Sequence, residues 1–311
     1  MKTKLGIVMM LLLLAAGQAQ GADYGFGYQP SLGAATAAVA DQLGFFRAEG
    51  VALETRIFND GTLINEALAA GAIQFGVVGD MPTITALAAR LPVKVVAAVG
   101  GGGKRERLMV RDSEVTAFSE LQGKRIGVTR GTSGFNAFQL LCQKYGYELT
   151  EFKLINIRPA NMPEALASAQ VDAVLTWEPT PSLIEAAGLG RELLNLKDSE
   201  LIFPLTLVVR TSVLENDPEA VRKVLKALRR AAEFIQENPT KAGEVVAKIS
   251  GLSPELAQRS LGYHFYEVGW TPQVENSLKK TAQMLWEQKE LRALPDWDTA
   301  IDASFCSRLG Y

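Results

Sequence analysis

The chain has 311 residues, of which 48% are apolar and 21% are charged, and its formal net charge is −2. This is an ordinary globular composition, and the near balance of charge argues against nucleic acid or an anionic membrane surface as a partner. The length exceeds the ~250–300 residues that a single hydrophobic core usually supports, which predicts two lobes.

The N-terminus has the three-part order of a secretory signal peptide. Lys2 and Lys4 supply positive charge, residues 5–16 form an uncharged apolar run, and small residues follow as far as Ala22. The run is shorter than the ~20 residues that span a bilayer, which argues against an uncleaved membrane anchor. No cysteine lies nearby for attachment of a lipid. We therefore expect residues 1–22 to be removed during export, which leaves the mature protein free in the periplasm.

Beyond this segment, short apolar runs alternate with longer stretches of helical periodicity, as is typical of α/β proteins with mainly parallel sheets. Strands are expected at residues 24–29, 53–58, 75–78, 93–99, 108–110, 126–129, 152–157, 173–176 and 205–209. Helices are expected at residues 34–43, 62–70, 135–145, 162–169, 217–237, 241–249, 254–260 and 274–290, and one more begins at Asp80 as its cap. This order predicts that residues 23–103 and 207–311 form lobe 1, with a helical C-terminal region, and that residues 104–206 form lobe 2.

Four consecutive glycines, Gly100 to Gly103, lie between the strand at residues 93–99 and the charged residues 104–107. A phosphate-binding loop would need a following Gly-Lys-Ser/Thr element or dinucleotide spacing, and neither is present. Because glycine gives the backbone its greatest freedom, we interpret the run as a flexible loop beside the crossover between the lobes.

The chain has two cysteines, Cys142 and Cys306, and one histidine, His264. Two separate buried thiols are the favoured interpretation, and a disulfide, which an exported protein could form, is the alternative. Without a cluster of cysteines and histidines, no zinc or copper site is expected. His264 lies among aromatic residues and is interpreted as structural, so we expect no catalytic residue, metal or cofactor.

Three polar turns, at residues 27–31, 79–83 and 129–134, each follow a predicted strand and lead into a predicted helix. In open α/β sheets, ligands bind beyond the carboxyl ends of strands, and helix N-termini offer N–H groups and partial positive charge to an anion. Thr132 and Ser133 add hydroxyl groups in the third turn. Helix capping alone would explain any one of these turns, but three in corresponding places favour a ligand site.

Trp177, Glu178 and Pro179 follow the last parallel strand expected in lobe 2. An aromatic ring beside a carboxylate could pack on a ligand and bind its polar groups; a buried tryptophan before a proline turn is the alternative. The same two interpretations apply to Tyr28 in the first turn. Glu178 and Asp80 argue against a purely anionic ligand, because uncompensated carboxylates would repel it.

Taken in order, these segments resemble the substrate-binding proteins of sulfonate, taurine, nitrate and pyrimidine-precursor importers. The resemblance spans residues 24–210 and rests on the ordered motifs Gly27-Tyr-Gln-Pro30, Leu43-Gly-Phe-Phe-Arg-Ala-Glu-Gly50, Glu66-Ala-Leu-Ala-Ala-Gly71, Gly79-Asp-Met-Pro82, Leu121-Gln-Gly-Lys124, Gly131-Thr-Ser133, Val171-Asp-Ala-Val174 and Trp177-Glu-Pro179. It implies a type 2 periplasmic binding fold whose lobes close on a small molecule in the cleft between them. It also implies a monomer that delivers this ligand to the transmembrane subunits of an ABC permease.

Carried over residue by residue, the ligand contacts of that family fall on Tyr28, Gln29, Asp80, Met81, Thr132, Ser133, Trp177 and Glu178. The motifs Gly-Asp-x-Pro and Gly-Thr-Ser are most similar to the sulfonate branch and imply a sulfonate or taurine-like ligand. Gly134-Phe135 and Glu178-Pro-Thr-Pro181 depart from that branch, so a pyrimidine or thiamine precursor and a nitrate-like anion stay open.

An exported enzyme and a sensor on the same fold are the remaining hypotheses. An enzyme would need a nucleophile paired with a base, and in the sequence the distant His264 is the one histidine available to Ser133.

Overall fold

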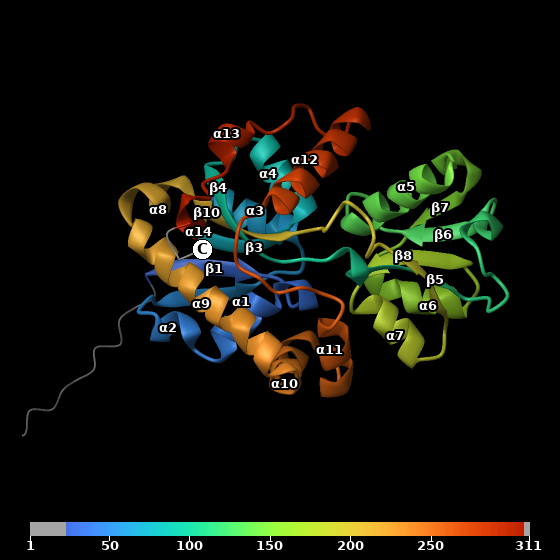
Figure 1. Ribbon diagram of the computed structural model, residues 1–311, viewed down its shortest axis with the longest axis horizontal. Helices are drawn as coiled ribbons and strands as arrows, with labels where there is room; N and C mark the ends of the chain where they lie inside the picture. The colour runs from blue at the N-terminus through green and yellow to red at the C-terminus, as the bar shows by residue number, and fades with distance from the viewer. Residues whose placement is uncertain (1–22, 308–311) are drawn as a thin grey trace, which may run out of the picture.

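The computed structural model describes residues 23–307, and the predicted signal peptide at residues 1–22 lies outside this range. Figure 1 shows two lobes, each built on a five-stranded sheet with helices on its faces, which confirms the predicted α/β class. No helix within the described range is long and apolar enough to cross a membrane.

The first sheet has the strand order β2-β1-β3-β10-β4 and forms the core of lobe 1. Its strands are β1 (Tyr24–Tyr28), β2 (Leu53–Ile57), β3 (Phe75–Gly79), β4 (Val93–Gly100) and β10 (Leu205–Arg210). Strands β1, β2 and β3 are parallel, whereas β10 runs antiparallel to both β3 and β4.

The second sheet has the equivalent order β7-β6-β8-β5-β9 and forms lobe 2. Its strands are β5 (Glu106–Val110), β6 (Arg125–Val128), β7 (Lys153–Asn156), β8 (Ala173–Trp177) and β9 (Arg191–Asn195). Here β6, β7 and β8 are parallel, and β5 runs antiparallel to β8 and β9. The chain therefore enters β10 of the first sheet directly from lobe 2, and it enters β5 of the second sheet directly from lobe 1. The sequence pattern did not predict β9, a half-buried edge strand.

The helices cover both faces of the two sheets. Lobe 1 carries α1 (Ala35–Gln42), α2 (Phe45–Ala48), α3 (Gly61–Ala69), α4 (Asp80–Ala88), α8 (Thr211–Asn216), α9 (Pro218–Glu237), α10 (Pro239–Ser250), α11 (Pro254–Leu261), α12 (Pro272–Glu287), α13 (Trp297–Ala300) and α14 (Ser304–Ser307), and lobe 2 carries α5 (Ser133–Tyr145), α6 (Met162–Ala167) and α7 (Thr180–Ala186). Short 3-10 helices are η1 (Leu32–Ala34), η2 (Gly103–Arg105), η3 (Phe118–Leu121), η4 (Leu149–Glu151) and η5 (Pro159–Asn161). The predicted helical C-terminal region is confirmed, and Pro218 opens α9 as expected.

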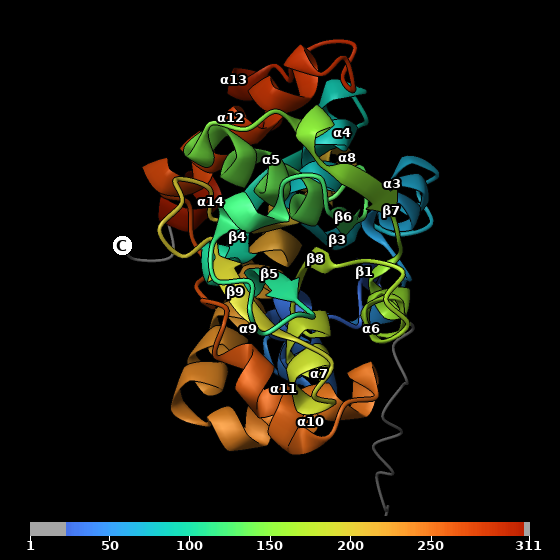
Figure 2. The same cartoon turned by 90° about the vertical axis from the view of Figure 1, so that its right-hand side faces the viewer.

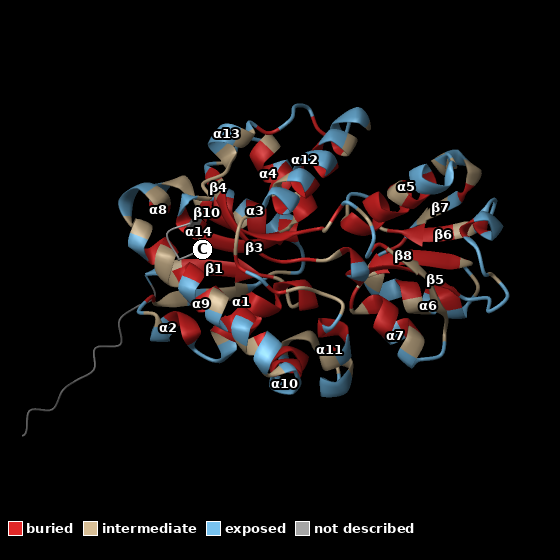
Figure 3. Cartoon of the chain, viewed as in Figure 1, coloured by how far each residue is buried: buried red, intermediate tan, exposed pale blue. Residues whose placement is uncertain are grey.

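Figure 3 shows that the central strands of both lobes are buried, whereas the outward faces of the helices are exposed. In lobe 1, Val224 and Leu228 of α9 pack in the same core as Val39 of α1. Burial of each such aliphatic side chain contributes about 1.5–3 kcal/mol to folding. The two cysteines are free and lie in different lobes, with Cys306 in this core and Cys142 in the core of lobe 2. The interpretation as two separate thiols is confirmed.

The glycine run lies at the crossover from β4 to β5, but the interpretation as a flexible loop is wrong. Gly101 exchanges backbone hydrogen bonds with Phe265, and the Gly102 N–H donates to the carbonyl of Ile202. A Cβ on Gly103 would lie 2.1 Å from the carbonyl oxygen of Leu196. The glycines therefore allow close backbone packing against the second crossover segment and against the segment after α11.

The two chain segments that join the lobes lie side by side, one before β5 and the other before β10. Strand β10 pairs in the first sheet along its whole length, beginning with Leu205 opposite Gly79. We propose that the lobes divide as the sequence predicts, near residue 104, and that the second boundary lies just before Leu205.

Candidate ligand-binding site

Helices α4 and α5 belong to different lobes and meet at their N-terminal ends. The Nδ2 group of Asn136 in α5 donates a hydrogen bond to the sulfur of Met81 in α4, at 3.1 Å. Helix α4 begins after Gly79, which has no side chain, and α5 begins after Thr132, whose side chain does not cap the helix. The N-terminal ends of both helices carry partial positive charge and lie at one place, although the carboxylate of Asp80 accepts hydrogen bonds from the first N–H groups of α4.

Asp80 is the first residue of α4 and not its N-cap, so the predicted position is wrong by one residue, but its carboxylate does accept hydrogen bonds from the backbone N–H groups of Asp80 and Met81. The same carboxylate belongs to a buried group of charges that we call the Arg105 cluster, which comprises Asp80, Arg105 and Glu106. These residues are only 2%, 5% and 0% exposed. The Nη2 atom of Arg105 lies 3.1 Å from Oε1 of Glu106.

Burial is the main influence on both carboxylates of the Arg105 cluster, because charge is costly in a poorly solvated site. It raises the pKa of Asp80 to about 6 and also raises the pKa of Glu106. The positive charge of Arg105 opposes both shifts, and the nearby hydroxyl of Ser133 in α5 opposes that of Glu106. The cluster thus joins α4 of lobe 1 to β5 and α5 of lobe 2.

Beside the cluster, Arg107 is held by three carboxylates and is only 1% exposed on its side chain. Nη1 lies 2.8 Å from Glu178 and Nη2 lies 2.6 Å from Glu185, while Nε binds Glu192. Burial disfavours the charge of Arg107, but these hydrogen bonds outweigh burial and raise its pKa. Each nitrogen of this guanidinium binds a carboxylate, so Arg107 organises lobe 2.

Contacts between α11 and α7 also hold the lobes together. Arg259 of α11 hydrogen-bonds to Glu185 of α7, and the ring of Tyr263, just after α11, lies 4.5 Å from the guanidinium of Arg107. Figures 1 and 2 both place α7 beside α11. The lobes are therefore in direct contact near the Arg105 cluster.

His264 lies on the segment that follows α11 and reaches the same cluster. Its Nδ1 atom is 3.2 Å from the carbonyl oxygen of Ser260, and because a carbonyl can only accept, Nδ1 must carry the hydrogen. Burial, helped by the charge of Arg105, lowers the pKa of His264 to about 3. The ring is therefore neutral at physiological pH, and its buried Nε2 is an acceptor without a partner among the described residues.

The structure brings together several of the predicted site residues. Asp80, Met81 and Ser133 lie at or beside the Arg105 cluster, as the contacts above show, and Trp177 pairs with Glu106 across β8 and β5. The backbone N–H of Glu178 donates to the carbonyl of Arg105, although its side chain is committed to Arg107.

Three predicted residues are not drawn into this group by any described contact. Tyr28 is buried in the core of lobe 1, and its hydroxyl donates to Asp41 at 2.9 Å. Gln29 reaches the carbonyl of Asn59 at 3.4 Å. The hydroxyl of Thr132 donates to the carbonyl of Thr129, one turn back along its own chain.

Sequence reasoning missed Arg105, Glu106, Arg107 and Asn136. The first three stand in a charged run, which normally indicates a solvated segment. Their position at the start of an apolar strand, next to the crossover between the lobes, is the sequence signal that could have indicated their burial. All five residues of β5 are buried because the strand lies between β8 and β9 in the sheet.

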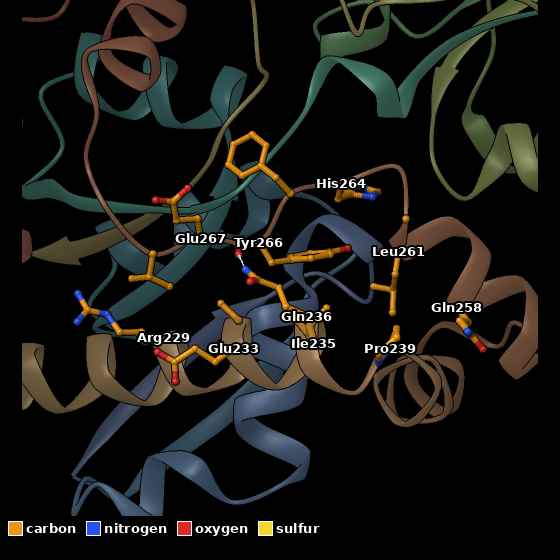
Figure 4. Close-up of a pocket in the computed structure, with 14 residues that line it drawn as sticks. Arg229, Glu233, Ile235, Gln236, Pro239, Gln258, Leu261, His264, Tyr266 and Glu267 are labelled. Carbon is orange, nitrogen blue, oxygen red and sulfur yellow. Dashed lines mark hydrogen bonds between the residues drawn. The ribbon is translucent and has the colours of Figure 1, made fainter. Parts of the chain in front are cut away.

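Two of the larger hollows lie outside the cluster. One, of about 710 Å³, lies between α9 and the segment after α11, and Figure 4 shows Tyr266 and His264 above Gln236 and Glu233 of α9. The other, of about 600 Å³, lies between α5 and α12. Neither is lined by a residue of the Arg105 cluster. No group of three or more possible metal ligands occurs in the described part of the chain.

A family model described as NMT1/THI5 like matches residues 18–242. The chain belongs to the NMT1/THI5-like family. This confirms the resemblance inferred from the ordered motifs, and it agrees with the two-lobed fold described above.

Relatives of this NMT1/THI5-like chain include binding proteins. A protein of Brucella abortus (strain 2308) named as a binding protein is 30% identical over 70% of this chain and 67% of its own length. The taurine-binding periplasmic protein of Escherichia coli (strain K12) is 27% identical and covers 96% of this chain and 97% of its own. The solved alkanesulfonate-binding protein of Xanthomonas axonopodis pv. citri, bound to MOPS, is 25% identical with a TM-score of 0.79 and covers 91% and 99% of the two chains.

The relatives also include an enzyme. The 4-amino-5-hydroxymethyl-2-methylpyrimidine phosphate synthase of Legionella pneumophila is 24% identical over 68% of this chain and 67% of its own length. The relatives of this chain therefore include both binding proteins and an enzyme.

Proposed function

We propose that this protein is the solute receptor of an ABC importer, with a sulfonate or taurine-like ligand held between its lobes. The observation that carries the proposal is the meeting of the N-terminal ends of α4 and α5, which come from opposite lobes. Two such ends can bind the oxygens of a sulfonate group from both sides. The names of the taurine-binding and alkanesulfonate-binding relatives support this ligand class.

Closure would then depend on the ligand, because its oxygens bridge the two helix ends and stabilise the closed arrangement. In the proposed cycle, residues 1–22 are removed on export, and the mature protein captures the ligand in the periplasm as a monomer. It then delivers the ligand to the transmembrane subunits of the permease. Met81 and Ser133, at the starts of the two helices, are the predicted contacts that we retain for the sulfonate end.

A thermal-shift screen of the mature protein tests this function. The panel contains taurine, straight-chain alkanesulfonates, nitrate and pyrimidines. We expect at least one sulfonate to raise the melting temperature in a saturable way, because a ligand that binds only the folded state stabilises it by mass action. Stabilisation by pyrimidines alone, with no response to any sulfonate or to nitrate, would contradict the sulfonate proposal.

An enzyme on the same fold is the second candidate, because the Legionella pneumophila synthase is a relative. Ser133 lies near Glu106, which gives the site a hydroxyl beside a carboxylate. The two thiols are buried in the cores of the lobes, away from this pair. Incubation of the pure protein with each stabilising ligand, followed by mass spectrometry, separates the candidates: an unchanged ligand supports a receptor, and turnover supports the enzyme.

A further inference from the structure

The charges at the cleft do not suit a ligand that is only an anion. Arg107 is fully occupied by carboxylates, so its charge is compensated within lobe 2. In the Arg105 cluster, the single charge of Arg105 faces two carboxylates, Asp80 and Glu106. With both ionised, the cluster carries an excess negative charge that is almost completely shielded from water.

Nearly all the unpaired polar atoms at the Arg105 cluster are hydrogen-bond acceptors. Oδ2 of Asp80 and Oδ1 of Asn136 are buried without a hydrogen-bond partner among the described residues, and the fully buried carboxylate of Glu106 has only Arg105 and the hydroxyl of Ser133 beside it. Nε2 of His264 is a further unpaired acceptor, since Nδ1 carries the hydrogen. Nε of Arg105 is the one unpaired donor of these residues.

Buried acceptors without donors cost free energy, and buried carboxylates need a positive partner. What would satisfy these groups is a compact cation with several N–H donors, such as a protonated amine. A sulfonate group supplies acceptors alone, so it cannot fill this place, although it suits the two helix ends beside it.

We propose that Glu106 and Asp80 form a subsite for a protonated amine of the ligand, and that the protein selects aminoalkanesulfonates over alkanesulfonates without an amine. This inference rests on the proposed function and adds the second charge of the ligand to it. The sulfonate lies at the N-termini of α4 and α5, and the amine lies between the carboxylates of the Arg105 cluster. Asn136 and His264 offer further acceptors to the amine.

Isothermal titration with taurine and 1-propanesulfonate tests the subsite. The two compounds have the same chain length and differ in an ammonium or a methyl group at the end. We expect the wild-type protein to bind taurine at least ten-fold more tightly. Glu106→Gln should reduce this preference at least ten-fold by weakening taurine alone, because the amide keeps the shape of the side chain and removes its charge. Asp80→Asn should act in the same direction.

Glu164→Gln is the matched control, since it makes the same chemical change on an exposed residue of α6 and should leave both affinities unchanged. Circular dichroism and melting temperature verify that each variant folds, and Asp80→Asn serves if Glu106→Gln does not fold. Equal affinities of the wild-type protein for the two sulfonates would overturn the proposal. So would equal losses for both sulfonates in the variants.

Failure of the proposed function gives a different result. If neither sulfonate binds but β-alanine or ethanolamine binds the wild-type protein and not Glu106→Gln, the amine subsite stands and the sulfonate ligand is wrong. If sulfonates bind and amines give no advantage, the function stands and the subsite is wrong.

Discussion

Asn136 and Met81 are joined across the junction of the two lobes by a hydrogen bond of 3.1 Å, although they belong to α5 of lobe 2 and α4 of lobe 1. Both side chains are buried, and they bring together the two helix ends to which we assign the sulfonate. We therefore expect this contact to help hold the lobes together, and its loss should weaken ligand binding.

We expect Asn136→Ala to weaken ligand binding about 3- to 10-fold, because a typical hydrogen bond contributes about 0.5–1.5 kcal/mol. The measurement is isothermal titration with whichever sulfonate the thermal screen identifies. Gln143→Ala, on the exposed side of the same helix, is the control and should bind normally. An unchanged affinity in Asn136→Ala would mean that this contact does not contribute to closure.

Arg107 should be essential to the stability of lobe 2. Replacement by methionine leaves Glu178 as a buried charge without its partner, and removal of one member of a buried ion pair costs about 3–5 kcal/mol. Urea denaturation of Arg107→Met measures this loss. Arg125→Met breaks the half-exposed pair with Asp172 in the same sheet and should cost less than about 1 kcal/mol. Similar losses in the two variants would contradict the assigned role of the network.

Gly103 should not tolerate a side chain. An alanine Cβ would lie 2.1 Å from the carbonyl oxygen of Leu196, a backbone atom that cannot rotate away. Overpacking of this kind costs about 1–3 kcal/mol or more, so Gly103→Ala should lower the melting temperature or prevent folding. A Cβ on Gly269 meets nothing within 4 Å, and Gly269→Ala should behave like the wild-type protein. A stable Gly103→Ala would restore the flexible-loop interpretation.

The buried Asp80 should make stability depend on pH. Its pKa rises to about 6 in the folded protein, above the ~3.9 of an unfolded chain. The folded state therefore holds this proton more tightly, and the stability that results is present at pH 4 and is lost as the pH rises through 6. His264 acts in the opposite sense, because its lowered pKa of about 3 destabilises the folded state as pH falls below ~6.5. The pH dependence of stability in the wild-type protein is therefore the sum of these two opposite contributions.

Comparison with Asp80→Asn isolates the carboxyl group. As pH rises from 4 to 7, the variant should gain stability relative to the wild-type protein, by at most about 3 kcal/mol. Urea denaturation at each pH, without ligand, gives the difference. A difference that does not change with pH would show that Asp80 titrates normally.

The sequence by itself determined the order of the elements and the class of the fold. Apolar runs and helical periodicity located nine of the strands to within a few residues, because those patterns depend on which face of a local segment is buried. Pro218 marked the start of α9 because a missing N–H costs nothing at a first helical turn. The turns after β3, β6 and β8 were recognisable for the same reason, since polar residues at strand ends are local signals.

Only the tertiary structure decided which groups surround the cleft. The charged run at Arg105, Glu106 and Arg107 looks solvated in sequence, and it is buried because β5 enters the middle of the second sheet. Glu178 and Glu185, which neutralise Arg107, come from more than 70 positions away, and no local periodicity can predict such a partner. For the same reason the sequence did not show that Tyr28 donates a hydrogen bond to Asp41. Nor did it indicate that Asn136 of α5 bonds to Met81 in the other lobe.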